Sequence, residues 1–232
     1  MTAQPVGEPV DATPAERPYR TPLTGRYVDV VPVDIDVHGD DLYQAATAPG
    51  ADSIWTYLSI GPWPSRSSFQ AWLAEYAQSK DPFPYTLVEK ASGRALGMAT
   101  YMRIEPAHRV IEVGSIWYSP ALRRSRAATE AMYLMAKHAF EHLRYRRYEW
   151  KCNSLNEPSR RAALRLGFTY EGLFRQHMIA RGRNRDTAWF SMLDLEWPAR
   201  RAAFERWLAP ENFDAEGRQR LPLRALRSVA DA

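Results

Sequence analysis

Cysteine, long apolar runs and net charge are all scarce in this 232-residue sequence. Cys152 is its only cysteine, which excludes an intrachain disulfide and a multi-cysteine zinc site and favours a reducing, cytoplasmic setting. No apolar run approaches the roughly 18 residues that a membrane-spanning helix needs. The N-terminus has neither a basic n-region nor an apolar h-region, so we expect no cleaved secretory signal. The net charge is only +4, which permits an anionic ligand without indicating nucleic acid.

The composition that remains is that of a globular protein, with 45% hydrophobic and 25% charged residues. Five of the 17 prolines fall in residues 1–23. Because proline removes backbone donors and this stretch has little to bury, we expect a disordered or loosely docked tail there. Residues 24–197 are expected to form one domain, and residues 198–232 a helix with an Arg-rich tail.

Alternating strand and helix signals predict a mixed α/β domain. Strands are expected over residues 27–33, 85–90, 95–104, 109–118, 147–153, 175–180 and 187–195. Helices are expected over residues 39–48, 65–79 and 127–143, and from an Asn156 cap to a stop at Gly167.

The junction between a predicted strand and the long predicted helix is strongly basic. Arg123, Arg124, Ser125 and Arg126 stand where the helix begins. Free N–H groups and the positive end of the helix dipole bind phosphate at such a position, and three guanidinium groups add charge. The sequence therefore predicts an anion site for a phosphorylated ligand.

This junction and the order of the predicted strands and helices resemble those of the GNAT acetyltransferase superfamily. The family's pyrophosphate loop has the pattern R/Q-x-x-G-x-G/A, which Arg123-x-x-Arg126-x-Ala128 matches except at the glycine. Three further stretches resemble the RimJ/RimL-like branch, which acetylates protein N-termini: Thr129-Glu130-Ala131, Asn156-Glu157-Pro158-Ser159 and Leu166-Gly167-Phe168. The resemblance implies a mostly antiparallel, twisted sheet with splayed central strands and helices on both faces.

The resemblance also implies acetyl-CoA as cosubstrate, with no metal. Its pantetheine arm would lie along Ile116-Trp117-Tyr118, where a backbone N–H can hold the thioester oxygen. Its diphosphate would lie on the loop formed by Arg123, Arg124, Ser125, Arg126, Ala127 and Ala128. Asn156 would touch the arm, although it is also explained as a plain helix cap.

The catalytic acid and base are less well marked. The family's acid tyrosine corresponds to Ala163 here, so Ser159, one turn earlier, becomes the substitute candidate, with a purely capping role as the alternative. Glu112 is the candidate base, because alternation places it on one strand face with Gly114, Ile116 and Tyr118; the alternative is an ion pair with a nearby arginine. Glu171 and His177 are further candidates for the base.

An aromatic cluster is the candidate acceptor site. Trp55, Tyr57, Trp63 and Tyr85, with Phe83, could clasp an apolar or cationic acceptor side chain, or could simply pack the loops. His138 and His142 have a metal-ligand spacing, but we interpret them as a solvated helix face. Cys152 is interpreted as a small buried residue.

The leading hypothesis is therefore an acetyl-CoA-dependent N-acetyltransferase, acting as a monomer or homodimer. Its acceptor would be a protein or peptide N-terminus or a small amine. The alternative is a non-catalytic acyl-CoA sensor or basic interaction module that keeps the fold, and Arg126 and Ala163 are the departures that favour it. Neither a membrane nor a nucleic-acid partner is expected.

Overall fold

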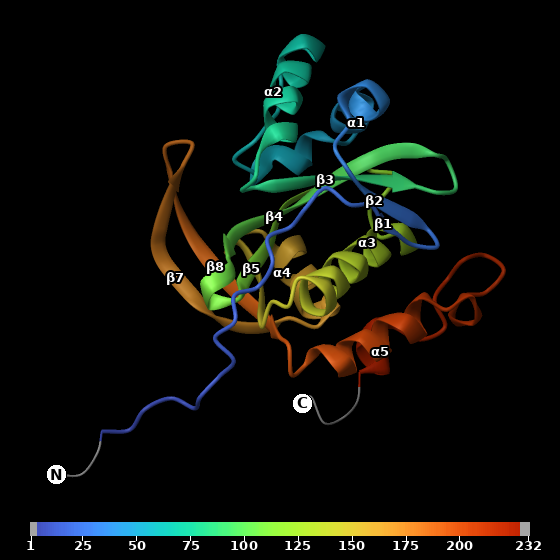
Figure 1. Ribbon diagram of the computed structural model, residues 1–232. Helices are drawn as coiled ribbons and strands as arrows, with labels where there is room; N and C mark the ends of the chain where they lie inside the picture. The colour runs from blue at the N-terminus through green and yellow to red at the C-terminus, as the bar shows by residue number, and fades with distance from the viewer. Residues whose placement is uncertain (1–3, 228–232) are drawn as a thin grey trace.

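The computed structural model describes residues 4–227, whose strands form one eight-stranded sheet (Figure 1). Residues 1–3 of the expected tail and 228–232 of the expected extension lie outside this range. Along the chain the strands are β1 (Leu23–Thr24), β2 (Val28–Pro32), β3 (Phe83–Glu89), β4 (Arg94–Glu105), β5 (Val110–Tyr118), β6 (Arg147–Asn153), β7 (Thr169–Ala180) and β8 (Arg183–Leu193). Their order in the sheet is β1-β2-β3-β4-β5-β6-β8-β7. All neighbours are antiparallel except the central pair β5–β6, which is parallel.

Helices cover both faces of this sheet. The five α-helices are α1 (Ile35–Thr47), α2 (Arg66–Gln78), α3 (Arg126–Lys137), α4 (Glu157–Leu166) and α5 (Trp197–Leu208). Helices α1 and α2 lie on one face, and α3, α4 and α5 on the other (Figure 1). The predicted fold class, a mostly antiparallel α/β sheet with helices on both faces, is confirmed.

Several element ends differ from the predicted ones for local reasons. Helix α1 begins at Ile35 rather than near residue 39, because the Asp34 side chain caps it by accepting from the N–H groups of Asp36 and Val37. Strands β7 and β8 are longer than predicted, because their pairing begins at Thr169 of β7 and continues to the hairpin tip, where Ala180 pairs with Arg183 of β8. The caps at Ser65 and Asn156 and the stop at Gly167 are confirmed.

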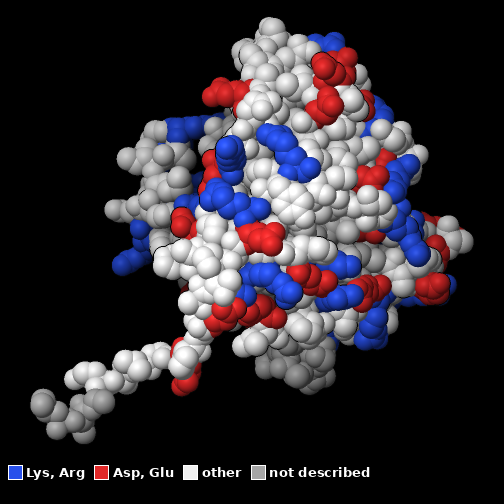
Figure 2. All heavy atoms as spheres, in the orientation of Figure 1, with Lys and Arg blue, Asp and Glu red and all other residues white. Residues whose placement is uncertain are grey.

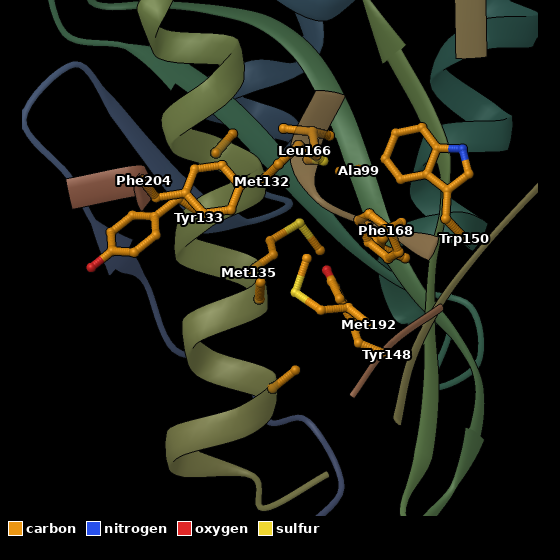
Figure 3. Packing of buried hydrophobic residues seen from close by; sticks show 14 of the residues in the cluster. Ala99, Met132, Tyr133, Met135, Tyr148, Trp150, Leu166, Phe168, Met192 and Phe204 are labelled. Atoms are coloured by element: carbon orange, nitrogen blue, oxygen red, sulfur yellow. The ribbon is translucent and has the colours of Figure 1, made fainter. Parts of the chain in front are cut away.

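Helix α3 carries the central apolar packing. Met132 and Met135 face the sheet, where Tyr148, Phe168 and Met192 lie (Figure 3). After Lys137 the helix widens into a π-turn over His138–His142.

The widened turn changes the interpretation of His138. This side chain is 3% exposed, so its assignment to a solvated face is wrong. Its ring lies beside Tyr101, with 3.5 Å between Nδ1 and the tyrosine oxygen. Burial is the main cause that lowers the pKa of His138, to about 4.

Both terminal segments touch the domain. The N–H of Ala15 donates to the carbonyl of Pro106 (3.0 Å) and that of Glu16 to the carbonyl of Leu143 (2.9 Å). Past α5, Phe213, Leu223 and Leu226 are buried and belong to the main core. Apolar anchoring at these points attaches the terminal segments to the sheet-and-helix body.

Candidate active site

The two central strands separate after a short stretch of pairing. β5 and β6 pair only from Val110 to Glu112 and from Arg147 to Glu149, although both strands run on. On its other side, β5 shifts register against β4 between Gly114 and Trp117, and Ser115 there has φ +46°. This bulge frees backbone groups from the ladder. The predicted pantetheine segment Ile116-Trp117-Tyr118 therefore borders an opening in the sheet.

A buried charge network lies on the α1–α2 face at the point where the strands part. Glu112 Oε2 accepts from Arg103 Nε at 2.6 Å and lies 3.1 Å from Lys151 Nζ. Lys151 Nζ also lies 2.6 Å from Glu149 Oε2 and 3.7 Å from the centre of the Trp189 ring. The side chains of Glu112 and Lys151 are only 4% and 2% exposed. Glu112 therefore forms the ion pair with an arginine that was the alternative to its role as the base. Lys151 is a second cation beside it.

An open cavity of about 570 Å³ adjoins this network. Its lining includes Asp81, Glu105 and Glu149, with Arg103 and Trp189. The three carboxylates attract a cationic amine, whereas the Trp189 ring already carries Lys151 and packs against Phe174. The cavity therefore leads from solvent to the carboxylate network.

Ser159 stands on the opposite face of the sheet from Glu112. Along β6, Trp150 and Cys152 alternate with Glu149 and Lys151 and so point to the α3–α4 side. The Trp150 indole N–H donates to Ser159 Oγ at 3.0 Å. Cys152 is buried, as predicted, and burial raises the pKa of its thiol. Ser159 and Glu112 are thus separated by the sheet that opens between β5 and β6.

The remaining candidate side chains on β7 and α4 have partners of their own. His177 Nδ1 lies 2.9 Å from Thr187 Oγ1, and its ring packs beside the paired rings of Phe174 and Trp189. Glu171 accepts from Arg147 and from Ser191; the Arg147 hydrogen bond is the main cause that lowers the pKa of Glu171. Asn156 Oδ1 accepts from the Ser159 N–H at 3.2 Å, which is the capping role.

The basic junction ahead of α3 divides into two groups of side chains. Arg123 and Arg124 are exposed. Ser125 Oγ accepts from the Ala128 N–H at 3.0 Å and caps the helix, and Ala127 and Ala128 are buried in its first turn. The Arg126 guanidinium is instead sandwiched between the rings of Tyr27 (4.9 Å) and Phe213 (4.6 Å). Arg126 therefore packs the C-terminal segment against α3.

A further cationic side chain lies near this junction and was not predicted from the sequence. Arg165, on α4, donates to Thr129 Oγ1 at 3.2 Å and lies over the Trp207 ring at 4.9 Å. Burial lowers the pKa of Arg165. No spacing in the sequence links α4 to the start of α3, so only the three-dimensional packing shows this arginine.

The aromatic candidates do not form one group. Trp55 and Trp63 contact each other at 5.0 Å and belong to the cluster under α1 and α2, where Trp55 also meets Trp117. Tyr57 lies between them in the chain, at the end of the 3₁₀ turn Asp52–Thr56. Tyr85 belongs to the other core cluster, and its hydroxyl donates to the Tyr19 carbonyl. The structure therefore separates Tyr85 from the tryptophans.

Neither the charge on the face shown in Figure 2 nor the metal-ligating side chains of residues 4–227 mark a further site. Basic and acidic side chains intermingle over the face shown in Figure 2. Within residues 4–227, no group of three or more His, Cys, Asp or Glu side chains could hold a metal ion. No helix in that range has the length and apolarity to cross a membrane.

Comparison with known proteins gives consistent matches. A family model described as an acetyltransferase (GNAT) domain matches residues 32–169. The chain is similar to the crystal structure of a GCN5-related N-acetyltransferase from Brucella melitensis, with 48% identity, a TM-score of 0.91, and coverage of 93% of this chain and 97% of that one. It also resembles a probable acetyltransferase of the GNAT family from Chromobacterium violaceum, with 41% identity, a TM-score of 0.77, and coverage of 85% and 100%.

A curated relative matches over a shorter stretch. The Bacillus subtilis protein named "Putative ribosomal N-acetyltransferase YdaF" is 29% identical over 105 residues, which are 45% of this chain. The match spans 57% of that protein's length.

Proposed function

Because the chain belongs to the GNAT acetyltransferase family, whose members use acetyl-CoA, we propose that it moves the acetyl group to a primary amine by direct attack within a ternary complex. The observation that carries this proposal is the opening between β5 and β6. It joins a face that holds a buried carboxylate network to a face that holds the Ser159 hydroxyl. An acyl donor and an amine can therefore meet there from opposite sides.

Each half of the reaction has a candidate residue. The amine nitrogen attacks the thioester carbon and loses a proton to Glu112, which Arg103 and Lys151 hold in place. Backbone N–H groups of the bulge hold the carbonyl oxygen as it gains charge. The carbon–sulfur bond then breaks, and the thiolate takes a proton from the Ser159 hydroxyl, the candidate acid, which regains one from solvent. His177, beside Trp189, is the second candidate for the base.

The diphosphate of acetyl-CoA is assigned to the junction before α3. The exposed Arg123 and Arg124 supply the charge, and backbone N–H groups at the helix start supply donors. Arg165 adds a cation beside Thr129. Arg126 is not assigned to the phosphates, because its guanidinium is committed to Tyr27 and Phe213.

An N-terminal α-amine is the acceptor that we favour over a lysine side chain. An α-amino group has a pKa of about 8, so deprotonating it at pH 7 costs on the order of 1.4 kcal/mol, whereas a lysine near 10.4 costs about 4.6 kcal/mol. The Bacillus subtilis relative is named a ribosomal N-acetyltransferase, and this name supports a protein amine as acceptor. Small amines with a low pKa are the second candidate, and a cytoplasmic location and a monomer or homodimer stay predictions.

The test is thiol release on mixing the protein with acetyl-CoA and a panel of peptide N-termini and small amines, with mass spectrometry of the acceptors. We expect release above the amine-free background together with an acceptor 42 Da heavier, the mass of an added acetyl group. A protein that binds coenzyme A tightly but releases no thiol with any amine would instead be the acyl-CoA sensor.

A further inference from the structure

Tyr76, on α2, carries a buried hydroxyl that the steps above do not use. Its ring is stacked on Trp72, with centroids 4.8 Å apart and planes 26° apart, which fixes its direction. Within residues 4–227, its oxygen is buried and makes no hydrogen bond of standard geometry, although the hydroxyls of Ser115 and Thr100 lie near it. Buried polar atoms without a partner are rare in native proteins and often mark a functional position.

The Tyr76 hydroxyl points toward the bulge in β5. Ser115 and Thr100 interact with it, but burial is the larger influence and raises the pKa of Tyr76. The phenol is therefore protonated at neutral pH and can donate. Thr100 Oγ1 has spent its one proton on the Gly114 carbonyl at 2.9 Å, so it can accept from Tyr76 but cannot donate onward. Ser115 can do both, because a hydroxyl accepts with its lone pairs and still donates its proton.

Ser115 also has an uncommitted hydroxyl. Within the described residues, the Ser115 hydroxyl donates to the Met102 sulfur, 4.0 Å away. A thioether is a weak acceptor. Its left-handed φ of +46° at a register shift holds this side chain at the opening. A serine in this backbone region is uncommon, and such strain concentrates at functional sites.

The two hydroxyls lie on the same face as the candidate base. A Cβ built on Gly114 would stand 3.1 Å from Glu112 Oε1, so that carboxylate lies against the residue preceding Ser115. Met102, which contacts Ser115, pairs with Glu112 across β4 and β5. The Tyr76, Ser115 and Glu112 side chains thus converge where β5 leaves β6.

We propose that the Ser115 hydroxyl donates a hydrogen bond to the carbonyl oxygen of the acetyl thioester, and that Tyr76 is a positioning residue that donates to Ser115 Oγ and orients it. This inference rests on the acetyl transfer proposed above. When the amine attacks, the carbonyl electron pair moves onto oxygen, and the Ser115 O–H stabilises that charge without giving up its proton. When the carbon–sulfur bond breaks, the pair returns and the hydrogen bond weakens.

The proposal is tested with Ser115→Ala, Tyr76→Phe and the double variant. Loss of one donor to a developing oxyanion costs on the order of 10²-fold in kcat. We therefore expect about a 100-fold loss for Ser115→Ala, about a tenfold loss for Tyr76→Phe, and a double variant no slower than Ser115→Ala, because Tyr76 acts through Ser115. A Tyr76→Phe enzyme with the wild-type kcat, or losses that multiply in the double variant, would overturn it.

Tyr148→Phe is the matched control. Tyr148 also has a buried hydroxyl without a partner in the described range, but it lies among Phe168 and Met192 in the core beneath α3 (Figure 3). Both phenylalanine variants should keep the wild-type melting temperature, and Tyr148→Phe should keep the wild-type kcat. A loss of activity equal in both would show a general packing effect and reject the proposal.

Binding measurements separate this inference from the transfer activity. Calorimetry should show acetyl-CoA bound about threefold to tenfold more weakly by Ser115→Ala, with the affinity for coenzyme A unchanged, because only the acetyl oxygen loses a donor. Equal affinities in wild type and variant for both ligands would contradict the hydrogen bond even in an active enzyme. A wild-type protein that acetylates no amine would contradict the proposed function. The comparison of acetyl-CoA and coenzyme A affinities would still test the hydrogen bond from Ser115 to the acetyl oxygen.

Discussion

At the scale of single residues, the buried ion pairs on β5 and β6 are the unusual feature. Lys151 lies between two carboxylates and over an aromatic ring, with its side chain 2% exposed. Removing one member of such a network leaves a buried charge without its partner, which is costly. Tests of Glu112 therefore use glutamine rather than truncation, because the amide oxygen can still accept from Arg103, and Lys151 keeps Glu149 as its charge partner.

Glu112→Gln should lower kcat by about 10² or more, because the amide keeps the shape but cannot take a proton. The acid limb of the pH–rate profile should disappear with it. Glu149→Gln is the control, since Glu149 also pairs with Lys151 but does not lie against Gly114. An unchanged profile in a folded Glu112→Gln protein would move the base role to water or His177.

His138 should make the protein sensitive to mild acid. Its folded-state pKa of about 4 lies below the ordinary 6.5, so the folded state disfavours the protonated ring. The stability from this neutral residue is complete above pH 6.5 and is lost as the pH falls from 6.5 toward 4, by about 1–3 kcal/mol. Urea unfolding of wild type and His138→Gln at pH 7 and pH 5 measures this, and the variant should lose less stability over that interval. Equal losses would contradict the assignment.

At the scale of elements, the start of α3 carries two kinds of arginine, the exposed pair proposed to bind phosphate and one that packs against aromatic rings. Arg123 and Arg124 are exposed, while Arg126 is sandwiched between aromatic rings from β2's leading turn and from the C-terminal segment. The pattern R-x-x-R assigns the same role to Arg123 and Arg126. The structure gives them different ones.

Exchanging these arginines for alanine should separate the two roles. Arg123→Ala with Arg124→Ala should raise KM for acetyl-CoA severalfold to tenfold or more, with the melting temperature unchanged, because phosphate contacts are lost. Arg126→Ala should instead lower stability by about 1–2 kcal/mol, through two lost cation–π contacts. Steady-state kinetics and thermal unfolding measure both. A stable Arg126→Ala protein with weakened acetyl-CoA binding would return Arg126 to the phosphate site.

Element positions could be predicted from the sequence because their signals are local. The cap at Ser65, the stop at Gly167 and the apolar spacing along α3 depend on neighbours within a few residues. Burial of His138 could not be predicted, because it follows from a π-turn that rotates the helix end toward Tyr101. The partners of Arg126 and Arg165 lie on remote segments, which no spacing reveals.

At the scale of the whole molecule, the β7–β8 hairpin curves toward the α2 side of the sheet (Figure 1). At its tip, Arg181 donates to the carbonyls of Ile60 and Gly61, in the loop before α2. The hairpin and this loop are therefore tied together across the face that holds Glu112. The splayed central strands were implied by the family resemblance, and an arginine partner for Glu112 was the predicted alternative. The point at which β5 and β6 cease to pair and the second cation Lys151 could not be derived from the sequence, because they depend on three-dimensional strand pairing.

Arg181→Ala should loosen this tie and raise KM for the amine severalfold, because the acceptor would then have to order the hairpin on binding. KM for acetyl-CoA should stay within twofold, since its assigned contacts lie on α3 and the other face. Arg183→Ala, on the same exposed hairpin, serves as the control. A larger effect on acetyl-CoA than on the amine would place the hairpin on the donor side.

The gap between β5 and β6 also bears on the kinetics of turnover. If donor and acceptor reach it from opposite sides of one sheet, neither product stands in the exit path of the other. Coenzyme A can then dissociate before the acetylated amine, or the acetylated amine before coenzyme A. The sequence of departure would be governed by relative affinities rather than by obstruction, so product-inhibition patterns should be those of a random mechanism.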